Sequence, residues 1–446
     1  TTPFLRVGLH SALGRLGFGW YPPHPLEEDT VRPFCGDARC WLKVPPGSTG
    51  AVTVDLHVPP DAVRGGSATV RANNVEATEK LSGTMWQTLR VEGVRADEKG
   101  LVEVRLQAPP FRPHEVFTNW DFRELGGAVR NVFFVADDEP ESRSYEGVSV
   151  IITTYKRWSI LEMTLDALRA QDWSNLQVVV MDDGSGDETW ENLQAYRDEH
   201  REHFRLKIAT QENQGQGMAR NNSLSMANED LVLFLGDDII PEPDMIRAHV
   251  ERHNAIGEYS AVVGFTDWYR KEINVTPFME MVNVDGHQFG YSFMKDGADQ
   301  PFTCFYTSNI SIDRKILGEK PFDPTFNSYG WEDVELGYRL SLRGVRIIYE
   351  KAACAGHHHM TTVKSFYRRQ LQVGRTHHDL LAIHPELLRN PYMPPERPRK
   401  WYRFTGPFVG FMVGAADALD RRNIPVPKKV LHHLMMIGFF RGRASF

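Results

Sequence analysis

The sequence predicts a mixed α/β domain with a mainly parallel sheet, preceded by an antiparallel β-sandwich and followed by C-terminal helices. Apolar and polar residues alternate in short runs over residues 1–140, whereas from residue 148 short apolar runs alternate with longer amphipathic ones. Alternation with period two is typical of strands with one buried face. Strand–helix alternation is typical of a parallel sheet that is covered by helices on both faces.

The N-terminal strands are expected at 51–58, 68–72 and 101–106, with turn-forming Pro-Pro, Gly-Gly and Glu-Lys-Gly segments between them. Such spacing is typical of an antiparallel sandwich. The polar segment 137–144 has no periodicity and is expected to be a linker. The predicted division is a carbohydrate-binding-like β-sandwich over 1–140, an α/β domain over 141–390 and a basic helical extension over 391–446.

The strands of the α/β domain are expected where apolar runs are short and nearly continuous, because a strand inside a parallel sheet is buried on both faces. These runs lie near 148–153, 176–181, 205–210, 231–235, 260–265 and 345–349. Helices are expected near 158–171, 187–203, 216–228, 242–256 and 363–381, and two short helices around 424–427. Residues 268–300, rich in Gly, Asn and aromatic residues, are expected to form an irregular loop over the site.

Length and composition restrict the class of protein. A chain of 446 residues suggests two or three domains, and the net charge of −7 argues against a general nucleic-acid binder. No apolar run approaches the roughly 18–20 residues that span a bilayer, and no secretory leader is recognised at the start. The four cysteines do not form a zinc-ligand set, so we expect reduced thiols in a cytoplasmic protein.

The C-terminal segment 397–446 is basic, with ten Lys or Arg against two Asp. Its apolar run 430–440 allows two interpretations that the sequence does not separate. The segment is suited to a helix lying on the inner face of an anionic membrane, and equally to a helix packed on the rest of the chain. The sequence does not reveal the oligomeric state and is compatible with an oligomer.

Two adjacent carboxylates, Asp237 and Asp238, follow the expected strand 231–235. Like charges at the end of a buried strand raise the free energy of the fold, and a bound Mg²⁺ or Mn²⁺ relieves that repulsion. The alternative is a turn in which Asp238 caps the next helix. Three histidines at 357–359 follow the last expected strand, and we expect His357, ahead of His359, to be a further metal ligand.

Glu332 and Asp333 begin a predicted helix within Gly-Trp-Glu-Asp. A carboxylate in the first turn is favoured by the helix dipole, so an ordinary cap is one interpretation. The other is a general base, because a rigid helix start can present a carboxylate to an incoming hydroxyl.

Between about 148 and 381 the chain contains, in this order, Val-Ile-Ile-Thr-Thr-Tyr, Met-Asp-Asp-Gly-Ser, Asn-x6-Arg, Leu-Gly-Asp-Asp, Trp-Glu-Asp and Gly-His. Taken together, these motifs resemble those of the family 2 inverting glycosyltransferases, which have the Rossmann-like GT-A fold. The resemblance implies a sugar transfer from a nucleotide-diphosphate sugar, by preference a UDP-sugar, to a hydroxyl of a glycan or glycoconjugate. The implied setting is bacterial surface or extracellular polysaccharide biosynthesis.

The resemblance also implies roles for individual residues. Asp333 is the expected catalytic base, with Glu332 beside it, and Asp238 the principal metal ligand, with Asp237 and His357 completing the shell. The expected donor-binding residues are Thr153, Thr154, Tyr155, Asp182, Asp183, Asn213, Arg220 and Asp237. One departure is that Gly236 stands where the family often has a third acid. Arg368 and Arg375, on one face of the helix 363–381, either hold the diphosphate or face solvent.

Two other classes of protein fit the sequence less well. A nucleotidyltransferase of similar architecture would need a basic Gly-rich loop near the first strand, and Thr-Thr-Tyr-Lys at 153–156 is not one. A non-catalytic glycan-binding protein is disfavoured by the intact acidic and histidine motifs. In the N-terminal module, Trp41, Trp86 and Trp120 are either sugar-stacking platforms or core residues, and the stretch 111–126 resembles jelly-roll modules of some bacterial glycosyltransferases.

Overall fold

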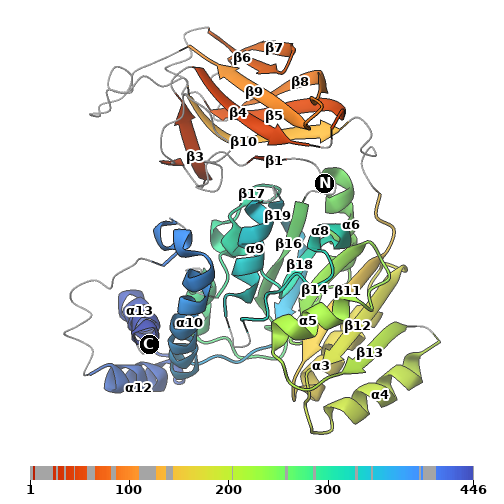
Figure 1. The fold of residues 1–446 in the computed structure, drawn as a ribbon. Coiled ribbons are helices and arrows are strands. Elements are labelled where there is room, and N and C mark those ends of the chain that lie inside the picture. The colour runs from red at the N-terminus through yellow and green to blue at the C-terminus, as the bar shows by residue number, and fades with distance from the viewer. Residues whose placement is uncertain are drawn as a thin grey trace. The chain divides into compact units, whose positions relative to one another are not determined.

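The computed structural model describes residues 4–5, 24–26, 29–34, 37–44, 46–57, 66–81, 87–109, 127–136, 144–202, 204–256, 260–284, 288–326, 330–342, 345–390, 393–394 and 408–444. The chain divides into two compact units (Figure 1). Unit 1 comprises Thr1–Glu141 with Leu340–Gly344, and unit 2 comprises Ser142–Arg339 with Val345–Phe446.

Unit 1 contains two antiparallel sheets, in agreement with the period-two pattern. The first has the order β2-β3-β10-β5-β8 with β1 paired to β10, and the second the order β4-β9-β6-β7. Their strands are β1 Phe4–Leu5, β2 His24–Leu26, β3 Asp29–Phe34, β4 Asp37–Lys43, β5 Thr49–His57, β6 Ser67–Ala72, β7 Val75–Lys80, β8 Gln87–Arg95, β9 Leu101–Gln107 and β10 Gly127–Ala136. Inward residues of both sheets form one apolar cluster that includes Leu42, Val54 and Phe134.

Several predictions for unit 1 lie outside the described residues. They concern Cys35, Trp86, Trp120, the stretch 111–126 and most of the expected linker. Trp41 on β4 is partly buried. Cys40, Cys304 and Cys354 are free thiols.

Unit 2 is built on a mixed, mainly parallel sheet with the order β13-β12-β11-β14-β18-β16-β19-β15, and β17 pairs with β19. All six predicted strands are present, as β11 Val148–Thr154, β12 Leu176–Asp182, β13 Arg205–Thr210, β14 Leu231–Gly236, β16 Ser260–Trp268 and β19 Arg346–His357. Three strands were not predicted: β15 Ile239–Pro241, β17 Asp299–Gln300 and β18 Asn309–Asp313. Strands β15 and β17 are too short to show a periodic pattern of apolar residues. Strand β18 has five residues and lies antiparallel between β14 and β16.

The predicted helices of unit 2 are also present (Figure 1). They are α3 Trp158–Arg169, α4 Thr189–His200, α5 Gln216–Leu224, α6 Met245–Ile256, α9 Glu332–Leu342, α10 Val363–Ile383, α12 Val409–Asp420 and α13 Lys428–Arg443, with a four-residue α8 Arg314–Leu317. The expected irregular loop at 268–300 was partly wrong, since it contains α7 Pro277–Val284 and a 3-10 turn at Tyr291–Phe293. Its apolar residues Phe278, Met279 and Val282 are buried, so packing stabilises this helix.

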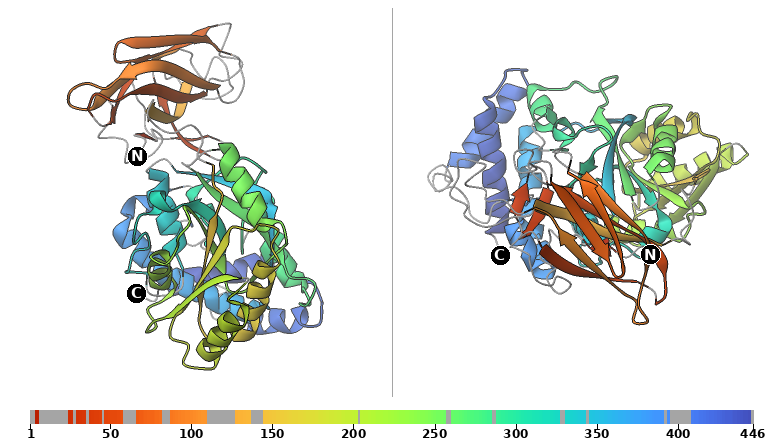
Figure 2. Two further views of the ribbon diagram at one scale, coloured as in Figure 1. Left: turned by 90° about the vertical axis from the view of Figure 1, so that its right-hand side faces the viewer. Right: turned by 90° about the horizontal axis from the view of Figure 1, so that it is seen from above.

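The C-terminal helices pack on unit 2. The expected apolar run 430–440 lies within α13, whose Leu434, Ile437 and Phe439 are buried, and this face contacts α10. A Cβ on Gly374 of α10 would lie 2.0 Å from the Phe439 carbonyl oxygen, so the two backbones approach closely. The run therefore packs inside the protein. Helices α10, α12 and α13 lie on the opposite side of unit 2 from β13 and α4 (Figures 1 and 2).

Candidate active site

The register of the parallel strands brings the predicted nucleotide-binding residues to one edge of the sheet. Thr154 is paired with Asp182, Asp182 with Thr210, and Thr153 with Gly236. These are the last residues of strands β11 to β14, and ligands of open α/β sheets bind beyond the carboxyl ends of their strands. The sequence motifs therefore meet because of strand register, although up to 83 residues separate them along the chain.

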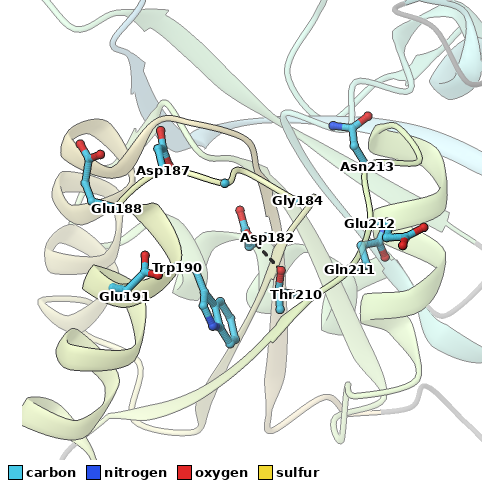
Figure 3. Close-up of a pocket in the computed structure, with 11 residues that line it drawn as sticks. Asp182, Gly184, Asp187, Glu188, Trp190, Glu191, Thr210, Gln211, Glu212 and Asn213 are labelled. Atoms are coloured by element: carbon cyan, nitrogen blue, oxygen red, sulfur yellow. Dashed lines mark hydrogen bonds between the residues drawn. The ribbon is translucent and has the colours of Figure 1, made fainter.

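Beyond β12 and β13 lies a cavity of about 880 Å³ (Figure 3). Asp182 and Thr210 lie at its base, joined by a hydrogen bond of 2.9 Å from Thr210 Oγ1 to Asp182 Oδ2, and Trp190 on α4 lies along its side. Its remaining acidic lining is Asp187, Glu188, Glu191 and Glu212. An anionic lining repels phosphate, so this cavity is better suited to a neutral base and ribose than to a diphosphate.

Asp183 holds the loop 211–215, part of which lines the cavity. Its carboxylate accepts hydrogen bonds from Gln211 Nε2 at 2.7 Å, Gln214 N at 2.9 Å and Gly215 N at 2.9 Å. Asn213 Nδ2 donates to the Asp183 carbonyl oxygen at 2.9 Å. Asp183 therefore positions the loop 211–215, and of the two acids only Asp182 lines the cavity.

Asp237 and Asp238 share one cation, Arg157. Its guanidinium donates from Nη1 to Asp237 Oδ1 at 2.8 Å and from Nη2 to Asp238 Oδ2 at 2.7 Å. Thr154 Oγ1 donates to the other Asp237 oxygen at 2.9 Å. Burial and the charge of Asp238 raise the pKa of Asp237 to about 6. Burial acts in the same direction on Asp238, but His357, His359 and Arg157 outweigh it and hold the pKa of Asp238 well below its usual range.

His357 reaches this pair because the short strand β15 pairs antiparallel with the end of β19, which places Ile239 opposite His357. His357 Nε2 lies 3.4 Å from Asp238 Oδ2, and the indole of Trp268 stacks on the imidazole at 5.4 Å. Burial lowers the pKa of His357, which favours the neutral ring that a metal needs. A Cβ at Gly356 would lie 2.6 Å from the Tyr269 ring, so glycine allows this close approach.

Among the described residues, Asp238, His357 and His359 form a group whose ligand atoms all lie within 4.8 Å of one another. His359 Nδ1 lies 3.6 Å from Asp238 Oδ2, and the imidazoles of His357 and His359 are stacked. His358 points elsewhere, toward Glu272. One ionised carboxylate and two imidazoles suit Mn²⁺ better than Mg²⁺. The donor set therefore fits a transition-metal ion. Asp237 lies outside this group, and Thr154 and Arg157 donate to its two oxygens.

The departure at Gly236 has a steric reason. A Cβ on Gly236 would lie 2.8 Å from Ile239 Cγ1 and 3.2 Å from Asp238 Oδ1. An acid at this position would therefore require the side chain of Ile239 or of Asp238 to shift.

The start of α9 holds a second acidic pair. Gly330 has a φ of 108° and Trp331 a φ of 75°, a conformation that L-residues rarely adopt, and such strain concentrates at functional sites. The Trp331 indole donates to the Val373 carbonyl oxygen of α10 at 2.8 Å and contacts the ring of His377. Packing on α10 therefore fixes the backbone just before Glu332 and Asp333.

Glu332 and Asp333 have different partners. Arg220 Nη1 donates to Glu332 Oε1 at 3.2 Å, both side chains are about nine-tenths buried, and Glu332 Oε2 is buried without a hydrogen-bond partner among the described residues. Asp333 Oδ1 accepts from Val334 N at 2.8 Å, a contact that also agrees with the cap interpretation. Burial and the neighbouring Glu332 carboxylate raise the pKa of Asp333 to about 7. A carboxylate with this pKa can accept a proton near neutral pH.

Residues 149–319 match the family model described as glycosyl transferase family 2. The chain contains a family 2 glycosyltransferase domain. The matched residues include Asp182, Asp238 and Arg220 but end before α9 and β19. The roles of Asp333 and His357 therefore rest on geometry and on the motif resemblance.

Curated relatives of this family 2 domain are named as glycosyltransferases. The chain is 28% identical over 237 residues to validoxylamine A glucosyltransferase of Streptomyces hygroscopicus subsp. jinggangensis, a match covering 44% of this chain and 52% of that protein. It is 26% identical to the pre-mycofactocin glycosyltransferase of Mycobacterium tuberculosis, covering 55% and 50%, and 26% identical to the hyaluronan synthase of Pasteurella multocida, covering 45% and 23%. The chain thus spans about half or less of the length of these relatives.

Among solved structures, a similar one is the mannosyltransferase PcManGT of Pyrobaculum calidifontis in complex with GDP-Man and Mn²⁺, with a TM-score of 0.42 and 16% identity over 69% of this chain and 77% of that one. In the family 2 domain described here, the mixed and mainly parallel sheet agrees with the α/β fold class expected from the sequence.

Of the remaining predicted residues of the family 2 domain, some lie at the strand ends or the cavity and others do not. Thr153 and Thr154 lie at the strand edge, and Asn213 lines the cavity, but the Tyr155 ring is 43% exposed and packs under Lys156. Arg220 is paired with Glu332 and with Gln216, so it joins α5 to the start of α9. Arg368 and Arg375 are exposed on α10, in agreement with the solvated-face interpretation.

Sequence reasoning missed Arg157 and Trp268 in this family 2 domain. Arg157 is the N-cap residue of α3, and its side chain reaches carboxylates 80 and 81 residues away. Its signal was weak, since a single arginine after a strand is common. Trp268 is the last residue of β16, and its pairing with His357 depends on a register that the sequence does not reveal.

Proposed function

We propose that the protein is a metal-dependent inverting glycosyltransferase that moves a sugar from a nucleotide-diphosphate sugar to a hydroxyl of a glycan or glycoconjugate. The observation that carries the proposal is the group of Asp238, His357 and His359 at the same sheet edge as the cavity beyond β12. Relatives named as a glucosyltransferase and as a hyaluronan synthase support sugar transfer and a glycan or glycoconjugate acceptor.

Charge would orient the donor. The acidic cavity would take the base and ribose, with Asp182 as its polar contact, and would repel the diphosphate. A divalent ion held by Asp238, His357 and His359, with Arg157 beside it, would supply the positive charge that attracts the diphosphate. We take a UDP-sugar as the preferred donor, a choice that rests on the resemblance to the family.

The metal would be held by Asp238, His357 and His359. When bound, a divalent ion of this kind stabilises the negative charge that grows on the leaving diphosphate. Asp237 orients Arg157 and so keeps a second positive charge beside the same edge.

Asp333 would act on the acceptor. The acceptor hydroxyl attacks the anomeric carbon of the sugar from the face opposite the nucleotide, while Asp333 takes its proton and the bond to the nucleotide diphosphate breaks. Attack from the opposite face inverts the anomeric configuration. The pKa of about 7 makes Asp333 basic enough to accept this proton. The neighbouring Glu332 is paired with Arg220, so Asp333 is the proposed base of the two.

A panel of nucleotide sugars tests the proposal. Release of the nucleoside diphosphate would be measured with Mn²⁺ and with EDTA, and the anomeric configuration of the product would be read from its proton NMR coupling. We expect release only with the divalent ion, and a product of inverted configuration. Equal rates in EDTA would contradict the metal assignment, and a retained configuration would contradict the role of Asp333.

A further inference from the structure

The exposed face of α12 is apolar, which is unusual for a surface helix. Phe411 is 81% exposed and Phe408 66%, and Leu419 and Ile424 are also exposed. Phe408, Phe411, Ala415 and Leu419 follow the spacing of three and four residues that places side chains on one helix face. A Cβ at Gly410 or Gly414 would meet no described atom within 4 Å, so the flanks of this face are open too.

The acidic residues of the same helix point inward. Asp417 accepts a hydrogen bond from Lys364 N at 3.0 Å, and Asp420 accepts one from Phe278 N at 2.8 Å. These amides lie in the first turns of α10 and α7, so the two carboxylates satisfy N–H groups that a helix start leaves without a partner. The orientation of α12 is therefore fixed by specific bonds, and its phenylalanines are outside because of that orientation.

Cations border this apolar face. Arg421, Arg422, Lys428 and Lys429 lie in the turn and first residues that follow α12, and all four are exposed. In the described segment 408–444 the acidic residues are Asp417 and Asp420, which are both buried, and Asp417 Oδ2 accepts a hydrogen bond from Arg421 Nε at 2.9 Å, so the charge of Arg421 is balanced within the protein. The surface thus combines exposed aromatic residues with positive charge in a chain whose net charge is −7.

We propose that this surface, here called the α12 patch and made of Phe408, Phe411, Leu419, Ile424, Arg421, Arg422, Lys428 and Lys429, docks on an anionic lipid membrane. Aromatic side chains inserted at the level of the headgroups and cations beside them are the two features of a helix that lies in an interface. The helix of 12 residues is about 18 Å long and would lie in the plane of the membrane. No described helix is long and apolar enough to cross one.

Lipid fits the α12 patch better than a protein partner for a reason of charge. The described segment 408–444 exposes cations and no acidic side chain. Such a surface matches the continuous negative potential of an anionic leaflet. The proposal does not depend on the enzymatic activity, because the patch contains none of the residues placed in the donor or base sites. It also changes the earlier sequence interpretation, since the membrane-facing element is α12 and not the apolar run in α13.

Vesicle sedimentation tests the proposal. The full chain would be mixed with vesicles of phosphatidylcholine plus phosphatidylserine and, separately, of phosphatidylcholine alone. We expect sedimentation with the first and little with the second, and release from the first as salt is raised. Failure of the full chain to sediment with the anionic vesicles would overturn the proposal, as would equal binding to both kinds of vesicle.

Point variants locate the contact. Phe411→Ser should weaken vesicle binding by about tenfold or more, because it removes a largely exposed aromatic side chain from the interface. The double variant Arg422→Glu with Lys429→Glu should weaken it by about 30-fold or more. The matched control is Phe293→Ser, which changes a phenylalanine that is 67% exposed elsewhere in unit 2 and should leave binding unchanged.

Melting temperatures would show that all variants are folded, which the exposure of the changed residues leads us to expect. Unchanged vesicle binding by Phe411→Ser would overturn the proposal. Sedimentation velocity would detect the main alternative occupant, a second copy of the chain. A dimer that dissociates in Phe411→Ser would assign the α12 patch to self-association and overturn the lipid assignment.

Discussion

The end of β14 and the start of α9 each bring two acidic residues together, but the two regions balance the negative charge differently. Asp237 and Asp238 share Arg157, and Asp238 also faces His357 and His359. In the second region Arg220 pairs with Glu332, and Asp333 accepts a hydrogen bond from a backbone amide.

The pKa values follow from this difference. His357, His359 and Arg157 hold the pKa of Asp238 well below its usual range, whereas burial and Glu332 raise the pKa of Asp333 to about 7. A permanently ionised carboxylate is suited to a metal ligand, and one that titrates near neutrality is suited to a base. Pairs of acids whose surroundings separate their pKa values are the usual sign of divided roles in an active site. The predictions below test whether the two regions divide the work in this way.

The largest effect is expected for Asp333→Asn. The amide keeps the size of the side chain but does not accept the proton, so turnover should fall about 10²-fold or more while the donor dissociation constant changes little. Loss of a helix cap alone would instead lower the free energy of unfolding by roughly 1 kcal/mol and leave the folded enzyme active. Steady-state kinetics, donor calorimetry and the melting temperature of the one variant separate the two interpretations. If Glu332→Gln, and not Asp333→Asn, abolished turnover, the base would be Glu332.

Asp238→Asn should weaken Mn²⁺ binding by about 10- to 100-fold, because it removes the one charged ligand of the group. Calorimetry with Mn²⁺ alone measures this without catalysis. The matched control is Asp237→Asn, at the neighbouring residue outside the group, for which a smaller loss is expected. An equal loss in both variants would return Asp237 to the metal shell.

The pH dependence should come from the base region. With metal and donor saturating, kcat should rise by about tenfold per pH unit below pH 7 and level off above it, since Asp333 accepts a proton only when ionised. Because folding raises the pKa of Asp333 from 3.8 to about 7, its contribution to stability is complete below pH 3.8 and is lost as pH rises to about 7. The melting temperature of the metal-free enzyme, compared with that of Asp333→Asn, should show this loss. A pH–rate profile that is flat from pH 5 to 8 would contradict the assignment.

The smallest effect is expected for Arg157→Gln. Without the guanidinium, the two aspartates keep less positive charge nearby, so the metal-free protein should lose about 1–2 kcal/mol of unfolding free energy, a range reduced for the partial exposure of Arg157. Added Mn²⁺ should restore part of the loss. Urea unfolding measures both values. The control Arg247→Gln, in an exposed pair with Asp172, should change stability by less than about 0.5 kcal/mol. Equal losses in the two variants would show that Arg157 has no special role.

The sequence by itself determined the order of the six predicted strands of unit 2, of the helices between them, and of the acidic and histidine motifs. All six predicted strands form, because buried strands of a parallel sheet need nearly continuous apolar runs that are visible locally. His357 was expected ahead of His359 as a metal ligand, and the structure brings both beside Asp238, because alternate side chains in an extended segment share a side. These features depend on spacing along the chain.

The tertiary structure alone decided which charges meet. Arg157 reaches Asp238, Arg220 reaches Glu332 and Trp268 stacks on His357 through strand register and helix packing between distant segments. The direction of α12 was decided in the same way. By pattern, Asp417 and Asp420 belong on the exposed face, but the amide groups at the starts of α10 and α7 draw them inward and leave Phe408 and Phe411 outside. Local spacing fixes which residues share a face, and only long-range partners fix where that face points.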